Sequence, residues 1–217
     1  MSHKAKKNTN NNLEDTNAVD VLWSAFQRLS AAILCLILSP ILVASYLAIR
    51  FTSQGGAIYS QVRVGHNGKR FMLYKFRSMY LANDPKFVQP DFTKSDREGV
   101  CIKLKRDPRI TAVGAFIRKY SIDELPQIFN VIKGDMLLIG PRPALPLEVD
   151  QYDVFALKRL EVVPGMTGLW QVSGRADTTF QEQISLDIKY IETKSFLTDM
   201  KISMMTVPAV LMAKGAY

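Results

Sequence analysis

The sequence predicts an α+β fold, mostly helical with a small β-hairpin or sheet, held at a membrane by an apolar N-terminal helix. Three observations support this: an uncharged apolar run near the N-terminus, one alternating hairpin pattern, and amphipathic helical patterns along much of the rest. The 217 residues, 47% of them hydrophobic and 22% charged, are enough for one domain with a core. We therefore divide the chain into a disordered tail at 1–20, a membrane helix at 21–50 and one domain at 51–217.

The membrane helix is predicted from Leu29 to Ile49, a run without charges that is bounded by Arg28 and Arg50. A straight helix of this length is roughly 30 Å long, about the thickness of the hydrocarbon layer of a bilayer. The run starts too late and is too long for the apolar part of a signal peptide. The preceding tail contains an asparagine-rich stretch that cannot build a core, so we expect it to be disordered.

The pair Ser39-Pro40 interrupts this run near its midpoint. A proline in a helix interior removes one backbone hydrogen bond and costs about 3 kcal/mol. In lipid the freed carbonyl needs another partner, and the Ser39 hydroxyl lies next to it. Two outcomes stay open: a kinked helix that spans the bilayer, or a re-entrant helix that leaves by the face it entered. Basic residues flank the run on both sides, and since a spanning helix would place one basic flank outside, charge favours the re-entrant form.

The elements of the remaining domain follow from its patterns. Two strand-like segments within 57–77 flank the turn His66-Asn67-Gly68 and predict a hairpin, and a polar loop is expected at 81–100. A last amphipathic segment has an apolar face that either packs on the core or lies on the membrane surface as an amphipathic surface helix. That face includes Phe196, Leu197, Ile202, Met205, Val207 and Leu211. The predicted helices lie near 111–119, 122–133, 147–160, 178–192 and 196–213.

Composition excludes several kinds of chemistry. The two histidines, His3 and His66, and the two cysteines, Cys35 and Cys101, are too few for a histidine-based triad, a Cys/His zinc site or a disulfide framework. The formal net charge of +8 indicates a polyanionic partner, which is a nucleic acid, an anionic bilayer or a phosphate-rich substrate. Any catalysis is therefore expected to use carboxylates, basic side chains and a hard metal ion.

Asp123 and Glu124 are adjacent acids that carry two interpretations. As part of a capping box, Ser121 would be the N-cap of a helix and Glu124 would reach back to its backbone. As a functional pair, one acid would be a nucleophile and the other a Mg²⁺ ligand, because a carboxylate attacks a diphosphate only where positive charge offsets the repulsion. Basic Arg118 precedes the pair and Gln127 follows it.

Three further segments carry candidate phosphate ligands, each with a structural alternative. Gly140-Pro141-Arg142-Pro143 fixes the backbone around Arg142, but it also fits a rigid turn with an exposed arginine. The segment 164–175, which ends at Arg175, fits a phosphate or sugar loop or an ordinary glycine loop, and it is neither a Walker motif nor a dinucleotide fingerprint. Lys75 and Arg77 end the hairpin, where basic residues often form a solvated face.

Six motifs occur in a fixed order and resemble a known family. They are KFRSM at 75–79, DPRITAVG at 107–114, SIDELPQ at 121–127, KGDM at 133–136, GPRP at 140–143 and PGMTGLWQVSGR at 164–175, followed by Leu186-Asp187 and Tyr190. Over residues 22–214 the chain is similar to the bacterial sugar transferases, the monotopic polyprenyl-phosphate phosphoglycosyl transferases. Its short length resembles the minimal form, and its ending, TVPAVLMAKGAY, resembles exopolysaccharide-initiating galactosyl- or glucosyl-phosphate transferases.

The resemblance implies roles for these residues. It implies a re-entrant membrane helix broken at Ser39-Pro40 and a catalytic domain on the cytoplasmic face of the bacterial inner membrane. Asp123 would attack a UDP-sugar in a Mg²⁺-dependent ping-pong reaction, with Glu124 holding the metal. The substrate-binding residues it implies are Lys75, Arg77, Arg118, Gln127, Arg142 and Arg175. The chain departs from the family at Gln27, where an acid usually follows Phe26, and at Ser78 in place of threonine.

The implied reaction moves a hexose 1-phosphate, of galactose or glucose, from a UDP-sugar to undecaprenyl phosphate, and releases UMP as a first membrane step of exopolysaccharide or other glycoconjugate synthesis. Three alternatives stay open: an inactive basic membrane scaffold, a nucleic-acid-binding protein, and a simple glycosyltransferase that releases UDP. No recognised nucleic-acid module occurs in the sequence, so we expect no nucleic-acid partner. The sequence leaves open whether the chain forms a homo-oligomer.

Overall fold

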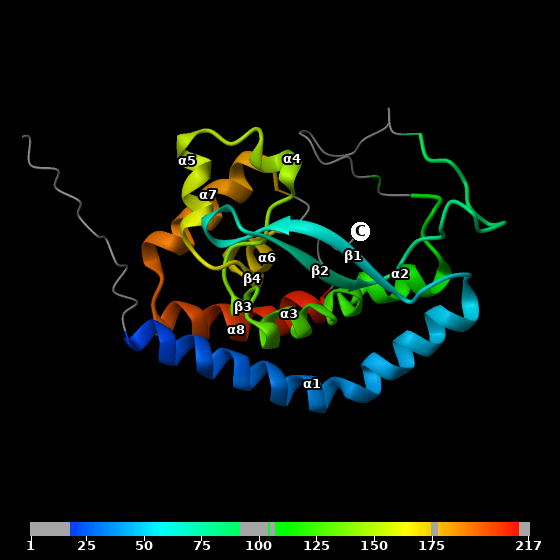
Figure 1. The fold of residues 1–217 in the computed structure, drawn as a ribbon, viewed down its shortest axis with the longest axis horizontal. Coiled ribbons are helices and arrows are strands. Elements are labelled where there is room, and N and C mark those ends of the chain that lie inside the picture. The colour runs from blue at the N-terminus through cyan, green and yellow to red at the C-terminus, as the bar shows by residue number, and fades with distance from the viewer. Residues whose placement is uncertain (1–17, 92–103, 105–106, 175–177, 213–217) are drawn as a thin grey trace, which may run out of the picture.

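A computed structural model describes residues 18–91, 104, 107–174 and 178–212 of the chain (Figure 1). The predicted disordered tail up to residue 17, residues 92–100 of the predicted polar loop and Arg175 lie outside these described residues. The structure is mostly helical, as predicted, and contains two small sheets. Its elements are α1 Ala18–Thr52, β1 Ile58–Val64, η1 His66–Gly68, β2 Arg70–Phe76, α2 Ala112–Lys119, η3 Ile122–Glu124, α3 Gln127–Lys133, β3 Leu137–Ile139, α4 Pro146–Val149, α5 Val154–Leu157, η4 Lys158–Glu161, β4 Gly165–Thr167, α6 Leu169–Ser173, α7 Phe180–Thr193 and α8 Phe196–Leu211.

The helix α1 extends along one side of the molecule and is longer than the predicted apolar run (Figure 1). Its span Val21–Thr52 has the length and apolar composition of a membrane segment, and only 11% of its most apolar window is buried against the rest of the protein. Large apolar side chains such as Leu36 and Phe51 are exposed on it. Because so much apolar surface is left uncovered, α1 fits a lipid-contacting helix better than a core helix.

Pro40 lies inside α1, and the helix bends near its middle so that both of its ends turn toward the body of the protein (Figure 1). The Ser39 hydroxyl donates to the carbonyl of Leu36 at 2.7 Å. This carbonyl is the acceptor that an amide at position 40 would use in a regular helix. The serine therefore provides the hydrogen bond that the proline removes.

Polar contacts fasten the N-terminal half of α1 to the body. The Trp23 indole donates to Asp199 at 3.0 Å, and Arg28 donates to the carbonyl of Ile132, at the end of α3, at 2.9 and 3.1 Å. Between them, buried Gln27 accepts a hydrogen bond from the Ile139 amide at 3.2 Å. Gln27 thus anchors α1 to β3 by a neutral amide oxygen, at the position where the resembling family has an acid.

The predicted hairpin is confirmed. Strands β1 and β2 pair antiparallel from Ile58 opposite Phe76 to Val64 opposite Arg70. The connecting turn η1 contains Asn67 in the left-handed region, at φ 52°, a conformation that asparagine tolerates better than most residues. The hairpin packs over α3 and α1, where buried side chains form the main core: Ala31, Phe71, Leu73, Ile128, Val131 and Met136.

Two predicted helices are broken in the structure. The segment 122–133 is not one helix: η3 forms a single 3₁₀ turn with a bond from the Leu125 amide to the Ile122 carbonyl, and α3 begins only after Pro126. The segment 147–160 is divided into α4, α5 and η4. In each segment a local signal begins a new helix: Pro126 at the start of α3 in the first segment, and the capping residue Asp153 at the start of α5 in the second. The helices predicted at 111–119 and 178–192 are confirmed within two residues.

A second sheet was not predicted. Strands β3 and β4 pair in parallel, with Leu137 opposite Gly165 and Ile139 opposite Thr167. Each strand has three residues, too few to show a period of two in the sequence. The pair matters for the site because the GPRP segment begins directly after β3.

The last helix, α8, packs on the core by a narrow stripe. Ile202 and Asp199 are buried, whereas Leu197 and Val207 are largely exposed. Asp199 accepts hydrogen bonds from the Trp23 indole and, at 2.9 Å, from the Tyr190 hydroxyl, so it joins α1, α7 and α8. Core packing of the whole apolar face is therefore wrong, because most of that face is exposed, and α8 contacts α1 near its own N-terminal end, where Phe196 and Asp199 meet Trp23.

Candidate active site

Asp123 and Glu124 lie in the single turn η3, between α2 and α3. Ser121 begins this turn in the left-handed conformation, at φ 55°, and its side chain makes no capping hydrogen bond. The capping-box interpretation is therefore wrong. Glu124 does not reach back along its own segment but extends to residues from two other parts of the chain.

Two cations hold the Glu124 carboxylate. Lys75, from β2, donates to Glu124 Oε1 at 2.7 Å, and Arg142, from the loop after β3, reaches the same oxygen at 3.3 Å. All three side chains are largely buried, with exposures of 16% for Lys75, 24% for Glu124 and 25% for Arg142. Lys75 is thus not part of a solvated strand face, and Arg142 is not a freely exposed turn residue.

The environment shifts the pKa values of Asp123 and Glu124 in opposite directions. Burial, followed by the adjacent Glu124 charge, raises the pKa of Asp123 to about 6, although Lys75, Arg118 and Arg142 oppose this rise. Burial also disfavours ionisation of Glu124, but the charges of Lys75 and Arg142 outweigh it and hold the pKa of Glu124 well below its usual range. Burial lowers the pKa of Lys75 despite its pairing with Glu124. The site therefore holds one firmly ionised carboxylate beside a second one whose charge is costly.

The loop that carries Arg142 is fixed along its backbone. Four consecutive carbonyls, those of residues 141 to 144, each accept a hydrogen bond from another part of the chain. The sequential donors are the Gly165 amide at 2.8 Å, Arg159 at 3.1 Å, Arg63 at 3.2 Å and the Val64 amide at 2.9 Å. The Arg142 guanidinium also lies 5.8 Å from the ring of Trp170. Arg142 is consequently presented by a rigid loop, as the two prolines around it suggested.

Two glycines of the segment 164–175 allow it to pack closely against this loop. A Cβ added to Gly165 would lie 2.0 Å from the Gly140 amide nitrogen, and one added to Gly168 would lie 2.2 Å from the Gly140 carbonyl oxygen. Such distances are impossible between real atoms, so only glycine permits the two backbones to come this close. Gly165 and Gly168 therefore act in packing against the GPRP loop.

The other predicted site residues are only partly brought together. Arg118 ends α2 and acts electrostatically on Asp123. Gln127 begins α3 and is 2% exposed, and its Nε2 has no hydrogen-bond partner among the described residues. Arg77 instead donates to the carbonyl of Gly56 at 2.7 Å, and more weakly to those of Ser53 and Gly55, so it ties the end of β2 to the chain after α1. Its contact with a substrate stays a prediction, as does that of Arg175.

Two residues that support the site were missed from the sequence. Asn130, fully buried in α3, accepts from the Tyr74 amide at 3.0 Å and donates to the Met72 carbonyl at 2.7 Å. It thereby fixes β2, and with it Lys75, against the helix that follows Glu124. Arg159, the second residue, contacts the Arg142 carbonyl from η4. Neither residue is recognisable from local sequence, because each acts on a distant segment.

The residues present fit a magnesium ion in a limited way. Among the described residues, no cluster of three or more Asp, Glu, His or Cys side chains could hold a metal by itself. Mg²⁺, however, is often held by one or two carboxylates together with the phosphates of a substrate. Asp123 and Glu124 supply hard oxygen atoms of this kind, so the pair suits a metal that arrives with a phosphorylated substrate.

A long exposed apolar helix indicates a membrane-associated protein, and the candidate site combines a carboxylate pair with nearby cations. The sequence model of the bacterial sugar transferase family matches residues 19–213. The chain therefore belongs to the bacterial sugar transferase family, as its motifs predicted.

Named relatives support the same membership. The chain is 37% identical to the exopolysaccharide production protein ExoY of Rhizobium meliloti, over 94% of this chain and 93% of the relative. It is 44% identical to the undecaprenyl-phosphate galactose phosphotransferase of Salmonella typhimurium, over 90% of this chain but 42% of that longer protein. It is 37% identical to the UDP-glucose:undecaprenyl-phosphate glucose-1-phosphate transferase of Caulobacter vibrioides, over 92% of this chain and 73% of the relative.

Proposed function

We propose that this protein transfers a hexose 1-phosphate from a UDP-sugar to undecaprenyl phosphate and releases UMP, as a first membrane step of exopolysaccharide or related glycoconjugate synthesis. The observation that carries the proposal is the Glu124 carboxylate held by Lys75 and Arg142 directly beside Asp123. The names of the Salmonella and Caulobacter relatives, which describe transfer of galactose or glucose phosphate involving undecaprenyl phosphate, support the same reaction.

In the first half-reaction, a carboxylate oxygen of Asp123 attacks the phosphorus atom that bears the sugar. A bond forms between this oxygen and phosphorus, and the bond from phosphorus to the bridging oxygen of the diphosphate breaks. UMP leaves with that oxygen and its electron pair. Burial prepares Asp123 for this step because its carboxylate is poorly solvated and its pKa is raised to about 6, which makes the ionised form a stronger nucleophile than a solvated one.

In the second half-reaction, a phosphate oxygen of undecaprenyl phosphate attacks the same phosphorus atom. The bond between Asp123 and phosphorus breaks, which regenerates the carboxylate and yields the lipid diphosphate sugar. Lys75, Arg118 and Arg142 lie within electrostatic reach of Asp123 and would offset the negative charge of the phosphates in both steps. Gln127 and Arg175 would contribute further substrate contacts.

A magnesium ion would supply charge neutralisation at the diphosphate when it is bound. Glu124 would hold it, with Asp123 close by. Lys75 and Arg142 hold the Glu124 carboxylate in its ionised form, which is the form that would bind the metal.

The location we propose is the cytoplasmic face of the bacterial inner membrane, with α1 as a re-entrant anchor. The bend at Pro40 and the Ser39 contact with the Leu36 carbonyl support this arrangement, because a bent helix can return both ends to one face. The exposed apolar side of α8 would rest on the same membrane surface.

Identification of the released nucleotide tests the reaction. The protein is incubated with Mg²⁺, undecaprenyl phosphate and each of UDP-galactose and UDP-glucose, and the nucleotide product is separated by chromatography. We expect UMP with one or both sugars and sustained release only when the lipid is present. Release of UDP would instead show simple glycosyl transfer, and no release with any UDP-sugar would favour an inactive membrane scaffold.

A further inference from the structure

We propose that Arg159, with its counter-ion Asp187, is a positioning residue that sets Arg142 for contact with the substrate diphosphate. This inference rests on the proposed function, because it assigns Arg142 a substrate phosphate to bind. Neither Arg159 nor its ion pair belongs to the cation cluster at Glu124, and Arg159 acts on that cluster only through the backbone of the GPRP loop.

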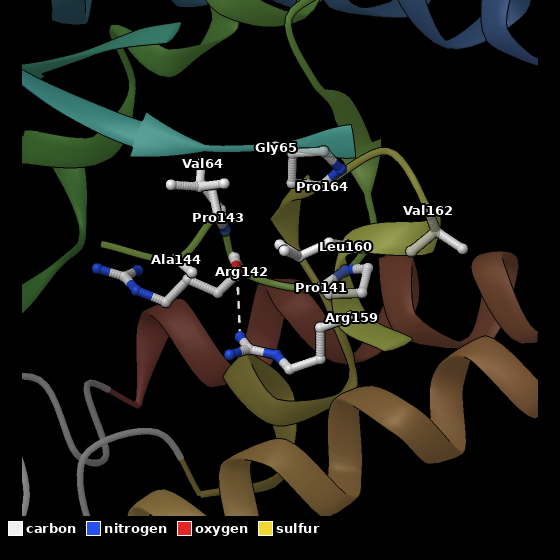
Figure 2. Close-up of a pocket in the computed structure, with 10 residues that line it drawn as sticks. All are labelled: Val64, Gly65, Pro141, Arg142, Pro143, Ala144, Arg159, Leu160, Val162 and Pro164. Carbon is white, nitrogen blue, oxygen red and sulfur yellow. Dashed lines mark hydrogen bonds between the residues drawn. The ribbon is translucent and has the colours of Figure 1, made fainter. Parts of the chain in front are cut away.

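The contact runs through a backbone carbonyl. Arg159 donates to the carbonyl oxygen of Arg142 at 3.1 Å. Figure 2 shows this bond, with the Arg142 carbonyl facing Arg159 and the Arg142 side chain extending away to one side of it. Because the carbonyl and the side chain belong to the same residue, a bond that fixes the carbonyl also fixes the backbone from which the side chain extends. The same guanidinium reaches Glu124 at 3.3 Å.

Two other side chains hold Arg159 in place. Its side chain is 2% exposed and pairs with the fully buried Asp187 of α7 at 2.6 Å, and it also donates to the hydroxyl of Tyr152. Charge pairing with Asp187 offsets part of the cost of burying a guanidinium beneath the loop. Leu186-Asp187 is one of the sequence features shared with the family, and this ion pair gives its acid a structural role.

The geometry needs a guanidinium. A planar fork can donate to a carboxylate and to a carbonyl at the same time, whereas the ammonium group of lysine has no such fixed arrangement of donors. Arg63 repeats the arrangement on the next residue, since it donates from β1 to the Pro143 carbonyl at 3.2 Å. Two buried arginines from different elements therefore hold the adjacent carbonyls of Arg142 and Pro143, in a loop that two prolines already stiffen.

A purely structural ion pair is the competing explanation, and a paired substitution separates the two. Arg159→Met combined with Asp187→Leu removes both charges together, and exchanging a buried ion pair for apolar side chains of similar size is often neutral for stability. The exposed Arg70→Met is the matched control. Three quantities are measured for each protein: the melting temperature, deuterium uptake by the peptide that contains residues 137–146, and kcat/KM for nucleotide release.

We expect the double variant to melt near the wild-type temperature, to exchange faster over 137–146, and to lose roughly 100-fold in kcat/KM, the size of effect that a displacement of about 1 Å produces. The loss is expected to shrink to a few-fold in an Arg142→Lys background, because Arg159 acts through Arg142. Unchanged exchange and kcat/KM would overturn the proposal, as would an equal loss in the Arg142→Lys background.

Two further measurements test the proposal if the double variant does not fold or if the protein shows no activity. If the double variant fails to fold, Arg159→Lys retains the charge next to Asp187 and is expected to show the same faster exchange and the same dependence on Arg142. If wild-type protein releases no nucleotide, the proposed function has failed. Deuterium uptake over 137–146 then still decides whether Arg159 holds the loop, because this measurement needs no reaction.

Discussion

The Lys75 ammonium lies 2.7 Å from Glu124 Oε1 and joins the end of the hairpin to the turn that carries the two acids. The two residues are 49 positions apart in the chain. Asn130 holds the strand of Lys75 by two hydrogen bonds, to Met72 and Tyr74, so the pair is set by backbone contacts rather than by flexible side chains alone. This relationship distinguishes the two neighbouring acids, since among the described residues Glu124, and not Asp123, forms an ion pair with a lysine.

Replacement of Lys75 by Met is expected to lower kcat/KM by roughly 100-fold while the protein stays folded. The variant leaves Glu124 with Arg142 as its remaining ion-pair partner among the described residues and removes a positive charge from the reach of Asp123. Rates of nucleotide release from wild-type and Lys75→Met protein check this. Lys69→Met, at the exposed turn of the same hairpin, is the control. Equal activity of all three proteins would remove Lys75 from the site.

Asp123→Asn is expected to reduce turnover by roughly three powers of ten or more, because an amide cannot take the place of a carboxylate nucleophile. The variant has nearly the same shape and removes one costly buried charge, so its melting temperature should not fall. Mass spectrometry of protein incubated with a UDP-sugar in the absence of lipid gives a direct readout. The peptide that contains residue 123 should gain a hexose phosphate in the wild type only. A modified peptide in the Asn variant would exclude Asp123 as the nucleophile.

Sequence patterns predicted the elements whose signal is local. The apolar run of α1, the alternation and turn of the hairpin, and the amphipathic α7 each have a period within one segment. The candidate acids and Arg142 were also found, because they lie in motifs with a recognisable order. The structure adds that Lys75 and Arg142 meet at a single oxygen of Glu124, which no spacing along the chain could indicate.

What the sequence could not predict depends on contacts between distant segments. Strands β3 and β4 have three residues each and form only because Gly165 permits close approach to Gly140. Glu124 fits a capping box by spacing, yet tertiary ion pairs outweigh that local contact. Arg159 follows ordinary helical residues in the sequence, and its role becomes visible only when η4 is placed under the GPRP loop.

Gly165→Ala is expected to destabilise the protein by at least about 1–3 kcal/mol, the usual cost of overpacking, and to lower activity with it. The added methyl would lie 2.0 Å from the Gly140 nitrogen and 2.5 Å from its Cα, and both are backbone atoms that a side-chain rotation cannot move aside. Gly56→Ala is the matched control, because its added methyl meets only the Ile58 carbonyl oxygen at 3.9 Å. Thermal unfolding of both variants checks this. Equal melting temperatures would show that the β3–β4 contact is looser than described here.

Pro40→Ala tests how α1 meets the membrane. Alanine restores the amide that can donate to the Leu36 carbonyl, which removes the reason for a bend and for the Ser39 contact. A straight α1 of 35 residues is long enough to cross the hydrocarbon layer. We therefore expect the proline to keep both flanks of α1 on one side of the bilayer and the alanine variant to place them, in at least part of the molecules, on opposite sides.

Cysteine labelling measures this topology. Single cysteines are introduced as Ser2→Cys, before α1, and Lys69→Cys, on the hairpin, after both natural cysteines are replaced by serine. A membrane-impermeant maleimide is then added to spheroplasts or to inverted vesicles. With Pro40 in place, both cysteines should react only in inverted vesicles. With Pro40→Ala, Ser2→Cys should become reactive in spheroplasts while Lys69→Cys does not. If the two cysteines react from opposite sides with Pro40 intact, α1 spans the bilayer as a kinked helix. This result would contradict the re-entrant arrangement proposed for α1.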